Sequence, residues 1–295
     1  MTIDVEDYFQ VSAFDAVVSR DSWDTFPSRV VANTERLLAM FDEHRVKSTF
    51  FVLGWVANRF PTLVADIAKA GHELASHGFH HRLVYDQTQD AFRDDVRRAK
   101  HLIEDQSGQQ VRGYRAPSYS ITNRSLWALD VLAEEGYTYD ASIFPIRHDR
   151  YGIPDAPRHP YAMARAAGSL TEAPPSTVRI GSTNLPVAGG GYFRLLPYQW
   201  TSWGIRRINE EEGKPAIFYL HPWEIDPDQP RLQASALSRF RHYRNLSETE
   251  PRLRRLLSEF RFGPLASLLD SVPESSSAVP PFASSPVPVV TARAR

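Results

Sequence analysis

The chain has 295 residues, of which 42% are hydrophobic and 23% are charged, and its formal net charge is −1. These values are typical of a soluble globular protein and give no overall electrostatic attraction to nucleic acid or to an anionic membrane. The absence of cysteine excludes disulfides, thiolate metal sites and a cysteine nucleophile. No apolar run reaches the roughly eighteen residues that a membrane-spanning helix needs.

Strand-like and helix-like segments alternate along the first part of the chain. Only three residues precede Asp4, so we expect a short first strand. Aromatic and β-branched residues predict a buried strand at 47–53, and 72–76 reads as a second, shorter strand. The segments 61–70 and 88–106 have apolar residues at helical spacing and predict helices, the second of them capped by Thr88.

The alternation continues toward the C-terminus. Further strands are predicted at residues 111–114, 137–142 and 216–220, and further helices at 125–135 and 198–212. Repeated strand–helix units indicate a parallel sheet, either open or closed into a barrel.

Two segments break this pattern. Residues 148–197 are rich in proline and glycine, which predicts a long loop with short strands, and residues 272–295 predict a disordered Ser/Pro/Ala-rich tail. The three glycines that begin at Gly189 suggest a phosphate-binding loop. No Lys-Ser/Thr pair follows them and no helix is predicted to open there, so a nucleotide site is not expected.

Polar clusters follow several predicted strands, at the edge of an α/β sheet where active groups gather. Two histidines four residues apart lie on one face of a helical turn, and imidazoles with carboxylates are typical zinc ligands. Any one cluster alone also fits a solvated acidic turn, a core histidine or a surface arginine, but their joint occurrence favours a metal-dependent hydrolase. The clusters contain Asp4, Glu6 and Asp7, then His77 and His81, then Arg115 and Ser118, and finally His221 and Trp223.

The order of these clusters resembles the NodB-homology polysaccharide deacetylases, which form carbohydrate esterase family 4. That family runs from an acidic strand end to His-x-x-x-His, Arg-x-Pro and Leu-His-Pro, and residues 2–225 match this order. The sequences Asp-Val-Glu-Asp-Tyr-Phe, Gly-Gly-Gly-Tyr-Phe-Arg and Arg-His-Tyr-Arg-Asn-Leu look like the exosortase-associated (PEP-CTERM-locus) subgroup. The resemblance implies an α/β fold, a distorted (β/α) barrel with an elaborated C-terminal region.

The resemblance also implies a metal site. His77 and His81 match the two histidine ligands of the family. The common pattern has a ligating aspartate directly after the catalytic base, but Val5 stands there, so Glu6 is the expected third ligand and Asp7 the reserve. The expected cofactor is one divalent metal, with Zn²⁺ as first choice and Co²⁺, Ni²⁺ or Fe²⁺ as alternatives. His80, between the two ligands, is expected to point elsewhere.

The implied catalytic roles complete the site. Asp4 matches the general base, Arg115 the arginine that orients this base, and His221 the general acid. The backbone N–H of Ser118 is expected to help stabilise the oxyanion. Substrate binding is expected from Ser118, Tyr119, Leu220 and Trp223, and the pocket rim from Asp140, Ser142, Arg147 and His148.

The sequence therefore predicts metal-dependent N-deacetylation of an N-acetylated sugar in an exopolysaccharide. The partner is an N-acetylated polysaccharide or oligosaccharide, and no nucleic acid is expected. We expect a catalytic domain at 1–225, an extension at 226–271 that packs on the barrel, and the tail at 272–295. Alternatives are an allantoinase-like hydrolase of small amides, a carbohydrate-binding relative without turnover, and a glycosidase that uses Asp4 and Glu6.

The cellular location of the protein and the role of the basic residues at 231–255 are each open to two interpretations. No basic and apolar leader is encoded, which predicts a cytoplasmic protein, with the inner membrane face as an alternative where lipid-linked intermediates would be met. The basic run could attract an anionic polysaccharide or a lipid pyrophosphate carrier. A solvated helix face balanced by nearby glutamates is the favoured interpretation.

Overall fold

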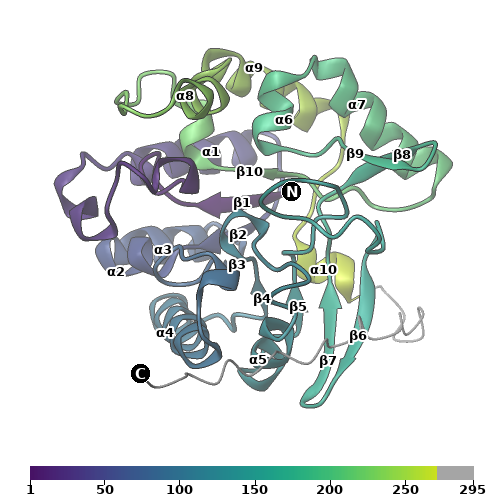
Figure 1. Cartoon of the computed structure of the whole chain (residues 1–295). Coiled ribbons are helices and arrows are strands. Elements are labelled where there is room, and N and C mark those ends of the chain that lie inside the picture. Colours follow the sequence, from purple (N-terminus) through teal and green to yellow (C-terminus); the bar gives the residue numbers. More distant parts are fainter. Residues whose placement is uncertain (271–295) are drawn as a thin grey trace, which may run out of the picture.

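The computed structural model describes residues 1–270, and it has a curled sheet of eight strands at its centre (Figure 1). All neighbours in the sheet run parallel except the last pair, β7 and β6, which is antiparallel. This arrangement confirms the predicted α/β fold with a distorted, open (β/α) barrel. In spatial order the strands are β10 (Tyr219–Leu220), β1 (Thr2–Val5), β2 (Thr49–Val52), β3 (Glu73–Ser76), β4 (Gly113–Tyr114), β5 (Tyr139–Asp140), β7 (Gly168–Glu172) and β6 (Tyr161–Arg165).

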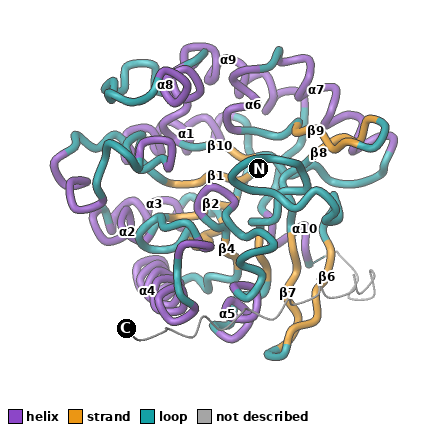
Figure 2. Tube along the Cα trace, viewed as in Figure 1, coloured by secondary structure: helices purple, strands orange, loops and turns teal. Residues whose placement is uncertain are grey.

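Helices surround the strands (Figure 2). The predicted helix at 88–106 is α4 (Gln89–Ser107), and Thr88 caps it because its hydroxyl accepts a hydrogen bond from the Ala91 amide. The helix predicted at 61–70 is α3 (Pro61–Lys69). The helix predicted at 198–212 is α7 (Tyr198–Arg206), which a π-helical turn continues. The other helices between the first strands are α1 (Val30–Glu43), α2 (Gly54–Arg59), α3 (Pro61–Lys69) and α5 (Ala128–Glu134).

The sheet separates two apolar layers. Successive side chains of a strand point to opposite faces. Ile3 and Val5 therefore pack with Phe50 in the core between the sheet and the helices, and Thr2 and Asp4 point to the barrel interior. On the interior side Phe51, Ala75 and Tyr139 pack against α10 (Leu265–Leu269). The polar strand ends are thus supported by a packed interior rather than by a pore.

The predicted loop at 148–197 contains more regular structure than expected. It includes β6 and β7, the hairpin of β8 (Thr177–Ile180) and β9 (Thr183–Pro186), and α6 (Gly190–Leu195). The expectation that no helix opens at the glycines was wrong, since α6 begins at Gly190. A Cβ atom on Gly189 would lie 2.0 Å from the Tyr219 carbonyl oxygen, so these glycines allow close approach to β10 instead of cradling phosphate.

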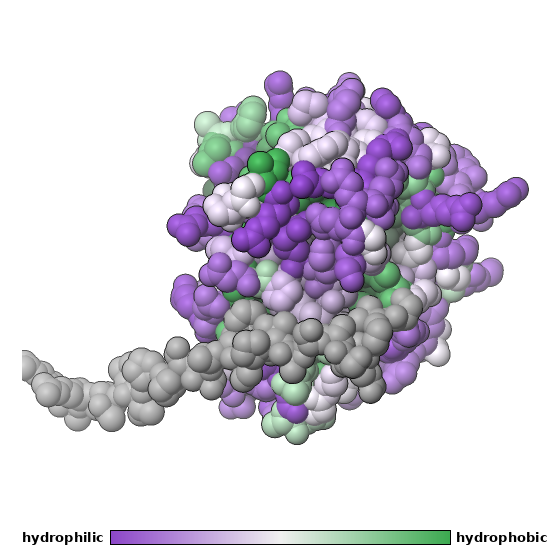
Figure 3. Space-filling view, turned by 90° about the vertical axis from the view of Figure 1, so that its right-hand side faces the viewer, coloured by the Kyte–Doolittle hydropathy of each residue, from purple (hydrophilic) through white to green (hydrophobic). Residues whose placement is uncertain are grey.

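The C-terminal part of the described chain covers one side of the barrel. It comprises α7 (Tyr198–Arg206), a π-helical turn (Arg207–Glu211), α8 (Ala236–Tyr243), α9 (Leu246–Glu259) and α10. The face in Figure 3 is largely hydrophilic, with small separate apolar areas. Within residues 1–270, none of the helices has the length and apolarity needed to cross a membrane. The tail predicted at 272–295 lies outside the described residues.

Candidate metal and catalytic site

The acidic side chains at the end of β1 are divided by strand alternation. Asp4 and Glu6 point to the same side, above the interior of the barrel, and Val5 between them is buried in the core. Asp4 and Glu6 are themselves only 2% exposed, so both carboxyl groups lie in a site largely removed from water. Val5 stands where the common pattern has a ligating aspartate. A side chain at that position of β1 faces away from the site, so the strand geometry explains why no ligand is found there.

His77 and His81 lie in the loop after β3. The sequence predicted a helical turn here, but this loop is not helical. Gly78 (φ 72°) and His81 (φ 51°) have left-handed backbone conformations that fold this loop back on itself. Asp95 accepts hydrogen bonds from the amides of Phe79 and His80, and Arg20 donates to the carbonyl oxygens of His80 and His81. These contacts fix the direction of the two imidazole rings.

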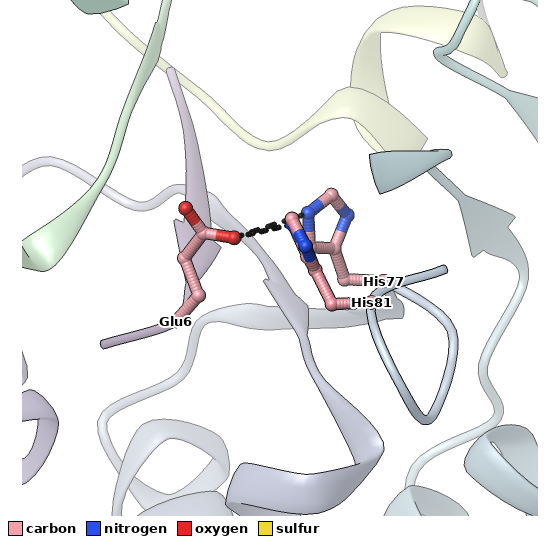
Figure 4. Close-up of side chains that lie close together, drawn as sticks. All are labelled: Glu6, His77 and His81. Atoms are coloured by element: carbon pink, nitrogen blue, oxygen red, sulfur yellow. Dashed lines mark ion pairs between the residues drawn. The ribbon is translucent and has the colours of Figure 1, made fainter. Parts of the chain in front are cut away.

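Glu6, His77 and His81 converge on one point (Figure 4). One ligand atom from each lies within 4.8 Å of the others, and Glu6 Oε2 is 2.6 Å from His81 Nε2 and 3.8 Å from His77 Nε2. Among the described residues, Glu6 Oε2 is a buried oxygen without a hydrogen-bond partner. An unsatisfied carboxylate oxygen facing two imidazoles is a donor set that suits a divalent transition metal.

The charge states also suit a metal. Burial would raise the pKa of Glu6, but His81, His221 and His77 hold it well below its usual value, so the carboxylate is ionised. Burial lowers the pKa of His77 to about 4, which keeps this imidazole neutral. The Nδ1 atom of His77 lies 2.8 Å from the Arg115 carbonyl oxygen, which leaves Nε2 to face the cluster.

Asp7, the reserve ligand, lies outside this cluster. Its carboxylate accepts hydrogen bonds from the amides of Arg29 and Val30 and from the Ser28 hydroxyl, so it caps the start of α1. His80 is half-buried and is likewise not part of the group of ligands.

Asp4 is held by Arg115, which is completely buried. Arg115 Nη1 donates to Asp4 Oδ1 at 2.6 Å and to Thr2 Oγ1 at 2.9 Å, and Arg115 Nε donates to the Ala141 carbonyl oxygen. The other carboxylate oxygen, Asp4 Oδ2, lies 3.8 Å from His221 Nε2. Arg115 therefore fixes the orientation of the Asp4 carboxylate, with one oxygen bound to the guanidinium and the other facing His221.

His221 faces the same space from the end of β10. Its Nε2 lies 3.7 Å from Glu6 Oε1, and its Nδ1 lies 2.7 Å from Glu224 Oε1. Burial disfavours the imidazolium, yet the hydrogen bond to Glu224 and the nearby carboxylates raise the pKa of His221 to about 9. Glu224 Oε2 in turn accepts a 2.6 Å hydrogen bond from Arg194 Nε, and both of these side chains are buried.

Glu224 and Arg194 were not assigned a role from the sequence. Glu224 follows His221 by three residues in the sequence His-Pro-Trp-Glu, a spacing that brings both onto one face of a short 3-10 turn (Pro222–Ile225). Arg194 belongs to the Gly-Gly-Gly-Tyr-Phe-Arg sequence, far from His221 along the chain. Only the close contact of α6 with the end of β10 brings it to Glu224.

The expected substrate-binding residues occupy different places. Leu220 pairs with Ile3 and is completely buried in the core, so it does not line a pocket; its neighbour Tyr219 packs with Tyr119 instead. Trp223 supports the site from behind: its Nε1 donates to Glu6 Oε1, and its ring stacks on His221.

The loop after Arg115 lies beside these groups. Ser118 and Tyr119 have left-handed backbone conformations, with φ of 51° and 53°, which make a tight turn. The Ser118 hydroxyl is 2.7 Å from the hydroxyl of Ser12, and the Tyr119 ring lies 5.6 Å from the Arg115 guanidinium. Of the expected rim residues, Asp140 and Ser142 are buried behind this loop, whereas Arg147 and His148 are more accessible.

The arrangement combines three chemical capacities. A metal held by Glu6, His77 and His81 would activate water and polarise a carbonyl group. Asp4, a carboxylate outside the group of ligands, can accept a proton, and His221, kept charged by Glu224, can donate one. These are the requirements for hydrolysis of an amide.

Comparison with known proteins points in the same direction. Residues 19–139 match the family model described as polysaccharide deacetylase, and residues 141–270 match a domain of unknown function (DUF3473). The site draws on both matched regions, since the histidine ligands lie in the first and His221 in the second.

Curated relatives and solved structures agree with this match. The chain is 30% identical over 98 residues to a peptidoglycan-N-acetylglucosamine deacetylase of Bacillus cereus, and 30% over 108 residues to a peptidoglycan deacetylase of Helicobacter pylori. These alignments cover 33% and 37% of this chain and 36% of each relative, so it spans about a third of their length. A crystal structure of a Mycobacterium smegmatis protein assigned as a polysaccharide deacetylase has the same fold, with a TM-score of 0.64, 20% identity, and coverage of 92% of this chain and 87% of that one.

Proposed function

We propose that this chain belongs to the NodB-homology polysaccharide deacetylase family (carbohydrate esterase family 4) and is a metal-dependent enzyme that hydrolyses N-acetyl groups of an exopolysaccharide. The observation that carries the proposal is the buried cluster of Glu6, His77 and His81 beside a free carboxylate, Asp4, and a charged imidazole, His221. The named activities of the relatives support the reaction type.

Each residue has a role in this proposal. Glu6, His77 and His81 would hold one divalent metal, with Zn²⁺ as the first choice, and such a metal would supply activation of a water and polarisation of the acetyl carbonyl. Asp4 accepts the proton of the attacking water while Arg115 holds its carboxylate in place. His221 then gives a proton to the departing sugar amine.

One feature supports the position of the substrate. The Ser118–Tyr119 turn lies next to Arg115, and the Tyr119 N–H donates to the Ala116 carbonyl oxygen, so the Ser118 N–H is the donor that we assign to the developing oxyanion. We assign catalysis to residues 1–225 and treat 226–271 as an extension that packs on the barrel. The exosortase-associated subgroup and a location at the inner membrane face stay predictions.

The experiment measures acetate release and bound metal for the purified protein and three variants. Asp4→Asn should lose at least about a hundredfold in kcat and keep its metal, because a base is removed but no ligand. His77→Ala should lose both metal and activity. His80→Ala is the matched control in the same loop and should keep both.

The choice of substrates separates the alternatives. Acetate release should be seen with an N-acetylated exopolysaccharide or its oligomers, and it is compared with peptidoglycan fragments and with small ureides. Full activity of Asp4→Asn would refute the base assignment. Turnover of ureides alone would favour a small-amide hydrolase, and sugar binding without any turnover would favour a carbohydrate-binding protein.

A further inference from the structure

The helix α8 presents an unusual face to solvent at the edge of the molecule, in the upper left of Figure 1. Leu237 and Phe240 are 57% and 54% exposed, more than any other large hydrophobic residue in the described part of the chain. Arg241 and Arg244 follow at helical spacing, and the Arg244 guanidinium lies 5.9 Å from the centre of the Phe240 ring. We call these four residues the α8 face.

The charge around this face is one-sided. Residues 231–247 contain four arginines and no Asp, Glu or Lys, although the whole chain has a net charge of −1. Within residues 1–270, none of these four arginines forms an ion pair. The arginines of α9 differ, because Arg254 pairs with Glu43 and Glu250, and Arg255 pairs with Glu259. For the basic run at residues 231–255, the favoured prediction was a solvated helix face whose arginines are balanced by glutamates. This description fits α9 but not α8.

The opposite side of α8 is attached to the proposed active site. His242 stacks on Trp223 with ring centroids 4.1 Å apart, and Trp223 donates to Glu6. Arg194, the partner of Glu224, also donates to the carbonyl oxygens of His242 and Arg244. Between a surface that binds the outer side of α8 and the residues behind the site, Trp223 and Arg194, there would therefore be this one helix.

We propose that the α8 face docks on an anionic lipid surface and holds the catalytic site next to glycan attached to or assembled at that surface. The proposal rests on the deacetylase function proposed above. Unpaired arginines are complementary to anionic headgroups, and exposed Leu and Phe side chains gain from entering the boundary between headgroups and acyl chains. An acidic polysaccharide would satisfy the arginines but would leave the leucine without an apolar partner, so lipid is favoured.

The two kinds of side chain predict separate losses of affinity. Each arginine near an anionic surface contributes roughly a factor of five in affinity, so Arg241→Gln with Arg244→Gln should weaken binding about 25-fold. Leu237→Ser with Phe240→Ser should weaken binding at least about tenfold, since both side chains leave water on docking.

The test is sedimentation of the full chain with vesicles of phosphatidylcholine alone or mixed with phosphatidylglycerol, at low and high salt. The matched control is Arg179→Gln with Ile180→Ser, because these exposed residues offer the same residue types on β8, across the molecule. Thermal unfolding of every variant checks that it is folded. Acetate release from a soluble oligomer is measured in parallel, and the α8 variants should retain it.

Support requires binding to the anionic vesicles only, its loss in both α8 variants and its retention in the β8 control. Equal sedimentation with neutral vesicles, no sedimentation, or binding that is insensitive to Leu237→Ser with Phe240→Ser would overturn the proposal. Salt-sensitive binding to alginate with no vesicle binding would identify an acidic glycan as the ligand and would also overturn it. Vesicle binding in a protein that releases no acetate would count against the proposed function alone.

Discussion

At the scale of single residues, the position of Glu6 shows what strand geometry does to a motif. A ligand two residues after the base shares its face of the strand, whereas a ligand directly after it must leave the strand to reach the same site. The sequence offered both Glu6 and Asp7, and their different surroundings separate them. Glu6 Oε2 is left without a hydrogen-bond donor, while the Asp7 carboxylate accepts several hydrogen bonds at the start of α1.

Glu224 gives a prediction at the same scale. Glu224→Gln keeps the shape of the side chain but removes the charge that favours the His221 imidazolium, so kcat should fall about a hundredfold with bound metal unchanged. Glu224→Ala should in addition destabilise the fold by about 3 kcal/mol, because Arg194 is left buried without its carboxylate. Kinetics, metal analysis and urea unfolding measure these effects.

Glu250→Gln serves as the control, since Glu250 pairs with arginines on the outside of α9. An unchanged kcat in Glu224→Gln would show that His221 does not depend on this carboxylate.

At the scale of elements, α1 depends on a residue outside its own segment. The Asp7 carboxylate accepts hydrogen bonds from the backbone N–H groups of Arg29 and Val30. At the start of a helix no carbonyl oxygen of the helix itself can accept from these groups. Asp7→Ala should lower the free energy of unfolding by about 3 kcal/mol, combining the loss of a cap with unsatisfied buried donors. Urea unfolding measures this, and the bound metal should stay at the wild-type level. Loss of metal from a folded Asp7→Ala protein would restore Asp7 as a ligand.

The junction of β5 and β7 gives a prediction about pH. Asp140 and Glu172 are paired in the strand register and hydrogen-bond to each other in a buried position. Burial raises the pKa of Asp140 to about 6, and burial together with Asp140 raises the pKa of Glu172 well above its usual value. The folded protein thus holds more protons than the unfolded chain above about pH 4, so this pair makes stability fall as pH rises through 6 and beyond.

Glu172→Gln should flatten that dependence. The amide keeps an acceptor for the Ile143 N–H and can donate to Asp140, so no second charge forms in the pair. Relative to the wild type, the variant should gain at least about 1.4 kcal/mol between pH 5 and pH 8, the equivalent of one pKa unit. Urea unfolding at the two pH values measures the difference. An equal effect at both values would contradict the proton-sharing arrangement.

The elements themselves were predicted unevenly. The strands at 47–53 and 72–76 and the helices at 61–70, 88–106 and 198–212 were confirmed, because the composition of a short buried run and the helical spacing of apolar residues are local signals. The helix α1 was missed, and its cap lies more than twenty residues upstream in Asp7. The helix at the glycines was wrongly excluded, since its start depends on contact with Tyr219.

At the scale of the whole molecule, a bound metal would connect the first strand to the loop after the third. Glu6 and His77 are distant in the chain, so the metal binds the folded state and not the unfolded one. At a free metal concentration about 100 times Kd, the gain in stability should be about 2.7 kcal/mol. That corresponds to a rise in Tm of roughly 4 to 5 °C for a chain of this size.

Differential scanning calorimetry with added Zn²⁺ and with a chelator measures this rise. His77→Ala should show none, and His80→Ala should match the wild type. A Tm that does not respond to metal in the wild type would argue that the cluster is empty in solution.

The sequence by itself determined the strands outside residues 148–197, the helices α3, α4 and α5 of the first half and the residue types of the site, because the composition of buried runs, helical spacing and motif order are written along the chain. The order of the motifs also indicated the type of α/β fold. Tertiary structure decided which acid joins the histidines, that Glu224 and Arg194 stand behind His221, and that Leu220 belongs to the core. These depend on side-chain direction and on contacts between segments far apart in sequence, which no local pattern encodes.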